Sequence, residues 1–258
     1  CVYVLTPGNH LETQRDKFSH PPEDRDRFEE PKRGDYAEHR RQAEKRFLGL
    51  IRSKIRDAAT MGSVPGWLSP GPALNNIGRM FQQLFEWDEA QQSYIAAVQA
   101  DPKNAEGLYS MGVLYGKAGH PENAEGSYKR AVELDVAHAN SWYNMGVLQR
   151  DSGREEDAEA SYRAAIAAED DHSEARNGLA TLLWNQGRVE EAERHFKAGL
   201  SYAPEDAKLN NNLGGLYVRM QKFKKAEYYF KAALEADPDH PQARANLDAL
   251  KNRKKNEL

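Results

Sequence analysis

The sequence predicts an all-α solenoid, a stack of repeated helix pairs, and three observations support this fold class. Five blocks of 34 residues follow one another from Gly71 to His240 without an insertion. Small residues recur at two fixed positions of every block, and aromatic rings recur at a third position on the same helical stripe. One such block cannot bury its apolar face alone, whereas stacked neighbours bury a continuous core.

The blocks are 71–104, 105–138, 139–172, 173–206 and 207–240. Position 8, where two helices cross closely, carries Gly78, Gly112, Gly146, Ala180 and Gly214. Position 20, the small site on the second helix, carries Ala90, Ala124, Ala158, Ala192 and Ala226. Position 24 carries Tyr94, Tyr128, Tyr162, Phe196 and Phe230. Large rings beside small sites predict that the side chains of each helix pair interdigitate.

These recurring residue classes resemble the tetratricopeptide-repeat (TPR) family over about two thirds of the chain. The resemblance implies helix-turn-helix repeats that form a right-handed superhelix, whose first helices line a concave groove. It also implies a protein-binding function without catalysis.

Four residues depart from the repeat pattern. Arg176 replaces an apolar residue at position 4, and Gln149 replaces an aromatic residue at position 11. Val136 and Asp170 replace the proline that ends other repeats. We expect these departures to disturb the local packing of repeats 3 and 4 but to leave the superhelix intact.

Residues outside the repeats form three predicted segments at the N-terminal side. Residues 1–34 are polar and proline-rich, and we expect an extended arm that lies along the solenoid's groove or a partner subunit. Residues 35–61 form an amphipathic helix, and residues 62–70 form a linker. The apolar face of the helix comprises Tyr36, Phe47, Leu48, Ile51 and Ile55. This helix either covers the start of repeat 1 or binds a membrane surface.

Residues 241–258 are predicted to form a capping helix with a basic tail. Ala243, Leu247 and Leu250 share one side of this helix, which closes the last apolar face of the stack. The basic residues at 251–255 favour the helix dipole, and the alternative is a localisation or nucleic-acid signal.

Composition excludes several function classes. The net charge of -4 and the pI near 6.1 give no general footprint for nucleic acid. No stretch of eighteen apolar residues predicts a transmembrane segment, and no motif of an enzyme or cofactor site is present. Three histidines share position 34, but one repeat separates them by roughly 20 Å, too far for a shared metal. Asn104 and Asp206 share that position, which predicts helix caps.

The only cysteine is residue 1, and it has two interpretations. Cys1 is either the lipidated first residue of a bacterial lipoprotein, at the periplasmic side of the cell envelope, or a trimmed boundary. In the second case we expect a cytoplasmic protein. One acyl chain alone anchors a protein only weakly.

The first helices carry recurring asparagines at positions 5 and 6, where the family's groove lies: Asn75, Asn76, Asn144, Asn177, Asn211 and Asn212. A carboxamide both donates and accepts, so a row of them could hold the backbone of an extended peptide. This row is similar to the asparagine ladder in the TPR domain of O-linked N-acetylglucosamine transferases. The alternative is that these asparagines bond to the neighbouring repeat.

Aromatic and basic residues complete the predicted peptide-binding groove: Tyr109, Tyr143, Trp184, Arg79, Arg150, Lys208 and Arg219. Aromatic residues and arginine are enriched among interface hot spots. We therefore expect a peptide segment with some acidic character. The carboxylate clamp of heat-shock cochaperones is absent, because position 9 carries Arg79, Val113, Val147, Thr181 and Gly215.

The sequence thus predicts a non-enzymatic scaffold that binds another polypeptide as part of a hetero-complex, without metal or cofactor. One alternative is an envelope lipoprotein, anchored through Cys1, that resembles the TPR proteins of pilus assembly. The other is the substrate-recognition arm of a larger enzyme, such as a glycosyltransferase.

Overall fold

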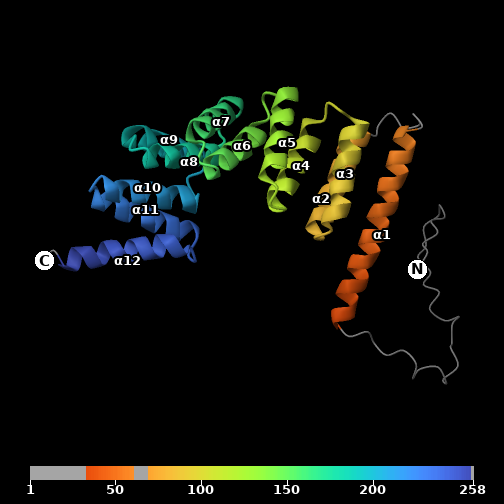
Figure 1. Cartoon of the computed structure of the whole chain (residues 1–258). Helices are drawn as coiled ribbons and strands as arrows, with labels where there is room; N and C mark the ends of the chain where they lie inside the picture. Colours follow the sequence, from red (N-terminus) through yellow and green to blue (C-terminus); the bar gives the residue numbers. More distant parts are fainter. Residues whose placement is uncertain (1–32, 61–68, 257–258) are drawn as a thin grey trace, which may run out of the picture. The chain divides into compact units, whose positions relative to one another are not determined.

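The computed structural model describes residues 33–60 and 69–256, in two units, 1–44 and 45–258. All regular elements in these described ranges are α-helices, so the predicted all-α fold class is confirmed (Figure 1). The described part of the first unit belongs to helix α1, Arg33–Thr60. There, Arg40 pairs with Glu44 at 2.8 Å, one helical turn away.

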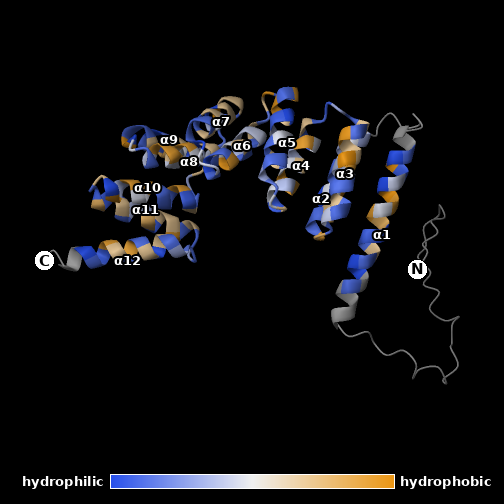
Figure 2. Cartoon of the chain, viewed as in Figure 1, coloured by the Kyte–Doolittle hydropathy of each residue, from blue (hydrophilic) through white to orange (hydrophobic). Residues whose placement is uncertain are grey.

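The second unit contains five helix pairs and a final helix. The pairs are α2 (Pro70–Gln83) with α3 (Trp87–Ala100), α4 (Ala105–Lys117) with α5 (Pro121–Leu134), α6 (Ala139–Asp151) with α7 (Glu155–Ala168), α8 (Ser173–Asn185) with α9 (Val189–Tyr202), and α10 (Ala207–Arg219) with α11 (Phe223–Ala236). Helix α12 (Pro241–Asn256) follows. Each second helix also packs against the next first helix, so the pairs form a continuous stack (Figure 1). Apolar residues are interspersed with polar ones along each helix (Figure 2).

Close contact between a small residue and a ring holds each pair together. At Gly146, an added Cβ atom would lie 2.9 Å from the Tyr162 ring, and at Gly214 it would lie 2.6 Å from the Phe230 ring. Tyr162 and Phe230 are almost completely buried. The glycines therefore let the two helices approach until the ring fills the space between them.

Position 34 caps the next first helix, as predicted from its residue types. The Nδ1 atoms of His138 and His172 accept the backbone N–H of Ser141 and Ala175, at 3.3 and 3.4 Å. Asp206 Oδ1 accepts from the N–H of Leu209 at 2.9 Å. The side chain thus satisfies a helix N–H that would otherwise lack a partner.

The departures in repeats 3 and 4 compensate for one another, contrary to our expectation of disturbed packing. The guanidinium of Arg176 donates to the Asp170 carbonyl at 2.9 and 2.7 Å, and its CZ atom lies 5.5 Å from the centroid of the Tyr202 ring. The indole of Trp142 donates in the same way to the Val136 carbonyl at 2.9 Å. A polar side chain at position 4 therefore fixes the turn six residues before it.

Gln149 also finds partners in the core at the position where an aromatic residue was expected. Its amide donates to Glu125 at 3.2 Å, and its carbonyl oxygen accepts from Ser161 at 2.6 Å. The carboxamide is therefore buried with both groups satisfied, and it ties α6 to α5 and α7.

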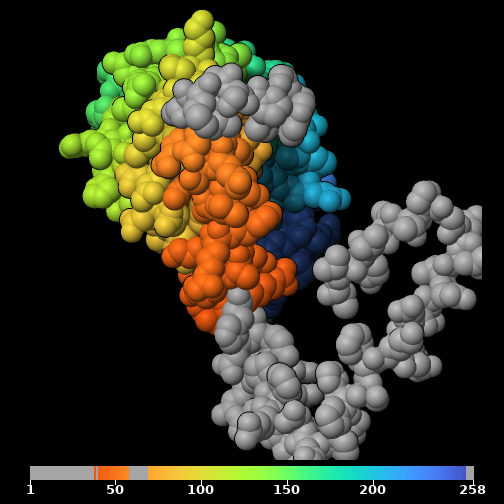
Figure 3. Space-filling view, turned by 90° about the vertical axis from the view of Figure 1, so that its right-hand side faces the viewer, coloured from red at the N-terminus to blue at the C-terminus, as the bar shows by residue number. Residues whose placement is uncertain are grey.

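Helix α1 covers the start of the repeats through only part of its predicted apolar face. From Lys45 onward, Leu48, Ile51 and Ile55 pack against residues of α2 and α3 (Figure 3). Lys45 adds a salt bridge to Glu86 at 2.7 Å. Phe47 was predicted on this face but is 62% exposed, because it lies one helical position away from the buried stripe. The side chain of Tyr36 lies outside the described residues.

The ends of the stack differ slightly from the predicted segments. Helix α2 begins at Pro70, which we had placed in the linker, because proline is tolerated in the first turn of a helix. Residues 61–68 and the arm at 1–32 lie outside the described residues. At the other end, Ala243, Leu247 and Leu250 of α12 are buried.

We predict that Gly112→Leu lowers the free energy of unfolding by about 1–3 kcal/mol, because a Cβ atom at Gly112 would overlap the Tyr128 ring. Gly126→Leu is the matched control in the same repeat, since nothing lies within 4 Å of its Cβ position. Urea unfolding measures both changes. Equal stability of the two variants would contradict the close-contact account.

The hydroxyl of Tyr162 generates a second prediction, because it is buried and bonds to no other described residue. Tyr162→Phe should raise stability by about 1 kcal/mol at neutral pH, since phenylalanine needs no hydrogen-bond partner. Repeats 4 and 5 already carry phenylalanine there.

Burial also raises the pKa of Tyr162 to about 12 in the folded chain, against about 10 when unfolded. The unfolded state therefore loses its proton first, and this contribution to stability is lost as the pH rises from about 10 to 12. Urea unfolding at both ends of this range should show a smaller alkaline loss for Tyr162→Phe than for the exposed control Tyr228→Phe. A loss of stability at neutral pH would show that the hydroxyl has a partner.

Candidate functional site

Three of the predicted groove residues line one pocket of about 390 Å³ on successive first helices. Tyr143 comes from α6, Asn177 from α8 and Lys208 from α10. The remaining lining residues are Glu174, Asp206, Ala207, Asp237 and His240. The pocket therefore spans repeats 3 to 5 and the turn before α12.

Negative charge exceeds positive charge at this pocket. The carboxylates of Asp206 and Asp237 are held by backbone N–H groups, at 2.9 Å from Leu209 and 3.1 Å from Asp239. Lys208 is exposed and forms no salt bridge with any described residue. Three carboxylates against one lysine favour a cationic group, so the acidic partner segment expected from the sequence does not suit this pocket.

The asparagines form hydrogen bonds between repeats, which is the alternative that the sequence left open. Asn212 Nδ2 donates to Asn177 Oδ1 at 2.9 Å, and Asn246 Nδ2 donates to Asn211 Oδ1 at 3.0 Å. Asn211 and Asn212 are joined at 3.4 Å. The carboxamides thus link α8, α10 and α12 in one chain of bonds.

Tyrosines at position 5 precede this chain in repeats 2 and 3. The ring of Tyr109 lies 5.1 Å from His138, and the ring of Tyr143 lies 5.2 Å from His172. Asn144 is hydrogen-bonded to Tyr109. Burial raises the pKa of Tyr109 and Tyr143, and nearby carboxylates add to the shift. Both phenols are therefore neutral hydrogen-bonding groups at physiological pH.

The other predicted residues do not line this pocket. Asn76 and Arg79 are exposed on α2, whereas Asn75 is buried and its side-chain oxygen has no partner among the described residues. Arg150 pairs with its neighbour Asp151 at 2.8 Å. Two further residues are joined to each other, since Arg219 Nη1 donates to the Trp184 carbonyl at 3.0 Å.

Sequence reasoning missed five of the eight lining residues. Glu174 occupies position 2, the same column as Lys208, so a complete reading of that column would have found it. Asp206 and His240 were interpreted only as caps, and the structure shows that capping residues also face the pocket. Nothing in the repeat pattern distinguishes Ala207 or Asp237 in advance.

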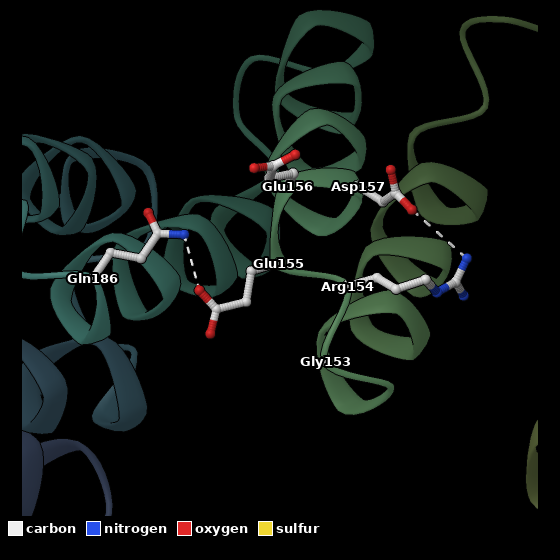
Figure 4. A pocket seen from close by; sticks show the side chains of 6 residues that line it. All are labelled: Gly153, Arg154, Glu155, Glu156, Asp157 and Gln186. Carbon is white, nitrogen blue, oxygen red and sulfur yellow. Dashed lines mark hydrogen bonds and ion pairs between the residues drawn. The ribbon is translucent and has the colours of Figure 1, made fainter.

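A second pocket, of about 530 Å³, lies at the turns between first and second helices (Figure 4). Its polar side chains are paired with one another or with neighbours. Arg154 lies 3.8 Å from Asp157 and 2.6 Å from Glu125, and Gln186 donates to Glu155 at 3.1 Å. These pairs leave little unused hydrogen-bonding capacity, so we assign no function to this pocket.

Other functional classes find no support in the described part of the chain. The described residues contain no group of His, Cys, Asp and Glu side chains that could hold a metal ion. Among the described helices, none has both the length and the apolar composition needed to cross a membrane.

The fold and the pocket define a helical repeat protein with its candidate site on the first helices. The model of the tetratricopeptide repeat matches residues 77–135, 109–174 and 177–241. The chain belongs to the tetratricopeptide-repeat family, whose fold is typical of scaffolds for protein–protein interaction. No curated protein matches its sequence significantly.

Solved structures of other TPR proteins are similar to the chain. YrrB, described as a TPR protein with an unusual peptide-binding site, is 22% identical, with a TM-score of 0.53, and the match covers 67% of this chain and 89% of YrrB. MamA is 26% identical, with a TM-score of 0.55 and coverage of 63% and 95%. The pilF protein of Pseudomonas aeruginosa is 15% identical, with a TM-score of 0.62 and coverage of 80% and 93%.

We predict a coupling free energy of about 0.5–1.5 kcal/mol between Asn177 and Asn212 in a double-mutant cycle with alanine, because their hydrogen bond joins two repeats. Urea unfolding of the two single variants and the double variant measures it. The control cycle pairs Asn212 with the exposed Asn76 and should give no coupling. Additive effects in both cycles would show that the bond contributes nothing to the stack.

Proposed function

We propose that this protein is a non-enzymatic scaffold that holds an extended segment of a partner protein along the first helices of repeats 3 to 5. The segment presents a lysine or arginine side chain to the pocket at Tyr143, Asn177 and Lys208. The protein acts as a subunit of a hetero-complex. The pocket across three successive repeats carries this proposal.

Asn177 offers the partner's backbone unused hydrogen-bond donors. Its oxygen accepts from Asn212, but its own amide N–H groups bond to no other described residue. These N–H groups are therefore available to a peptide carbonyl. Lys208 offers a second donor across the pocket, and an extended segment could contact both helices.

A cationic side chain suits the remaining walls of the pocket. Glu174 and Asp237 supply negative charge, and the aromatic face of Tyr143 can attract a cation that is partly desolvated. Neither carboxylate is paired with a lysine or arginine in the described residues. The partner would therefore supply the missing positive charge.

The similarity to YrrB supports peptide binding as a use of this fold. At 22% identity it supports the fold alone and says nothing about the ligand of this chain. The lipoprotein alternative depends on Cys1, which lies outside the described residues, and it stays a prediction. The same holds for the recognition arm of a larger enzyme and for binding of α1 to a membrane.

A peptide-display selection against the whole chain, followed by fluorescence anisotropy, tests the proposal. Selected peptides should share a lysine or arginine, and Glu174→Lys should weaken them roughly tenfold because it places like charge in the pocket. Glu122→Lys is the matched control, since Glu122 also lies in the first turn of a helix and is exposed.

Control binding should stay within about twofold of the original chain, a difference smaller than one interface contact contributes. Two results would refute the proposal. One is selected peptides that bind Glu174→Lys unchanged, and the other is an equal loss in both variants, which would indicate a general charge effect.

A further inference from the structure

A cluster of lysines and tyrosines lies apart from the proposed groove, on α9, α10 and α11. It surrounds a pocket of about 310 Å³, and we call it the α11 basic patch. The lining residues are Lys197, Tyr217, Lys224, Lys225, Tyr228 and Tyr229. None of them lines the pocket of the proposed function.

Repeat 5 departs here from the pattern of the chain's own other repeats. At positions 18 and 19 the first four repeats carry Asp88-Glu89, Glu122-Asn123, Glu156-Asp157 and Glu190-Glu191, whereas repeat 5 carries Lys224-Lys225. Acidic residues stabilise the first turn of a helix, and lysines destabilise it. The lysine pair therefore opposes local helix stability, so the fold alone does not account for it.

Two tyrosines accompany the lysine pair. Positions 22 and 23 carry Tyr228 and Tyr229 in repeat 5, whereas the other repeats carry Gln92-Ser93, Gly126-Ser127, Ala160-Ser161 and Arg194-His195. Tyr228 is 67% exposed and meets Tyr229 edge to face, with ring centroids 5.1 Å apart. Tyr229 stacks in turn on Tyr217 at 5.5 Å. The rings form a platform, and its outermost member is open to solvent.

The cations of the patch have fewer carboxylate partners than those elsewhere in the stack. Lys224 and Lys225 form no salt bridge with any described residue. Glu193 is the nearby carboxylate, and it already pairs with Lys197 and accepts the hydroxyl of Tyr217 at 2.8 Å. The ammonium groups of Lys222 and Lys225 lie 5.9 and 5.3 Å from the Tyr217 ring centroid. Positive charge is therefore concentrated without internal compensation.

We propose that the α11 basic patch binds an acidic segment of a partner polypeptide. Lys224 and Lys225 bind its aspartate or glutamate carboxylates in charge-assisted hydrogen bonds, and the exposed Tyr228 packs against the segment. The small pocket accommodates one or two side chains. A nucleic acid is disfavoured because the whole chain carries a net charge of -4, which opposes a long polyanion.

The patch therefore gives the scaffold a second contact with chemistry opposite to that of the groove pocket. It stands on different residues and does not depend on the proposed function. Because acidic character was expected of the groove's partner, this patch also supplies the binding site for negative charge that the groove lacks.

The test uses a fluorescein-labelled octaglutamate peptide and the 258-residue chain. Fluorescence anisotropy should show saturable binding that weakens at high salt, and no binding of an octaglutamine peptide of the same length. Lys224→Glu with Lys225→Glu should weaken octaglutamate binding by roughly tenfold or more. This double variant restores the acidic pair of repeats 1 and 4, so it should fold at least as stably as the original chain.

Lys129→Glu with Arg130→Glu is the matched control, because it makes the same change of charge on exposed residues of another second helix. Its binding should remain within about twofold of the original chain, since it removes no contact with the peptide. Tyr228→Ala, which copies Ala160 of repeat 3, should weaken binding without changing the salt dependence.

Three results would overturn the proposal. The first is equal loss in the two charge-reversal variants, which would indicate attraction by the net charge alone. The second is unchanged octaglutamate binding in Lys224→Glu with Lys225→Glu. The third is binding of an oligothymidylate in place of the peptide with the same dependence on the lysine pair, which would assign the patch to nucleic acid. Each is independent of the display selection that tests the groove.

Discussion

The contact between a small residue at position 8 and an aromatic ring at position 24 sets the geometry of every repeat. The Tyr162 ring shows how far this constraint reaches, because added Cβ atoms at Gly146 and Gly178 would both lie 2.9 Å from it. Gly146 belongs to the same repeat and Gly178 to the next. One ring therefore closes its own helix pair and also determines how near the following first helix lies.

This constraint explains the composition of the candidate site. Position 6 of repeat 4 is a glycine because the Tyr162 ring occupies the space that an asparagine side chain would need. The asparagine function in that repeat therefore depends on Asn177 at position 5, which bonds to Asn212 in the next repeat. Packing in the core thus decides which polar groups remain available on the first helices.

The sequence was sufficient to predict the all-α solenoid, the interlocking small residues and rings, and the caps at position 34, because each depends on contacts at fixed spacing. Residues whose role depends on three-dimensional neighbours were harder to predict. The pairing of Arg176 with Asp170 and the burial of Gln149 required the structure. Phe47 was misplaced because an amphipathic stripe can be shifted by one position without losing its periodicity.

The candidate site was predicted only in part for a related reason. Columns of the repeat indicate which helix face is exposed, but not which charges are compensated by neighbours. Tyr143, Asn177 and Lys208 were found in this way, whereas the carboxylates around them and the lysine pair of α11 stand out only when pockets and salt bridges are known. The account that results places two contacts of opposite charge on one stack.

The most direct measurement of the central claim is an NMR titration of the isotope-labelled chain with a peptide that binds it. Binding in the groove predicts amide shift changes in the first turns of α8 and α10 and around Tyr143 in α6. Residues of the second helices α5 and α7 should remain unchanged. Shift changes confined to second helices, with none at Asn177 and Lys208, would contradict a binding groove on the first helices.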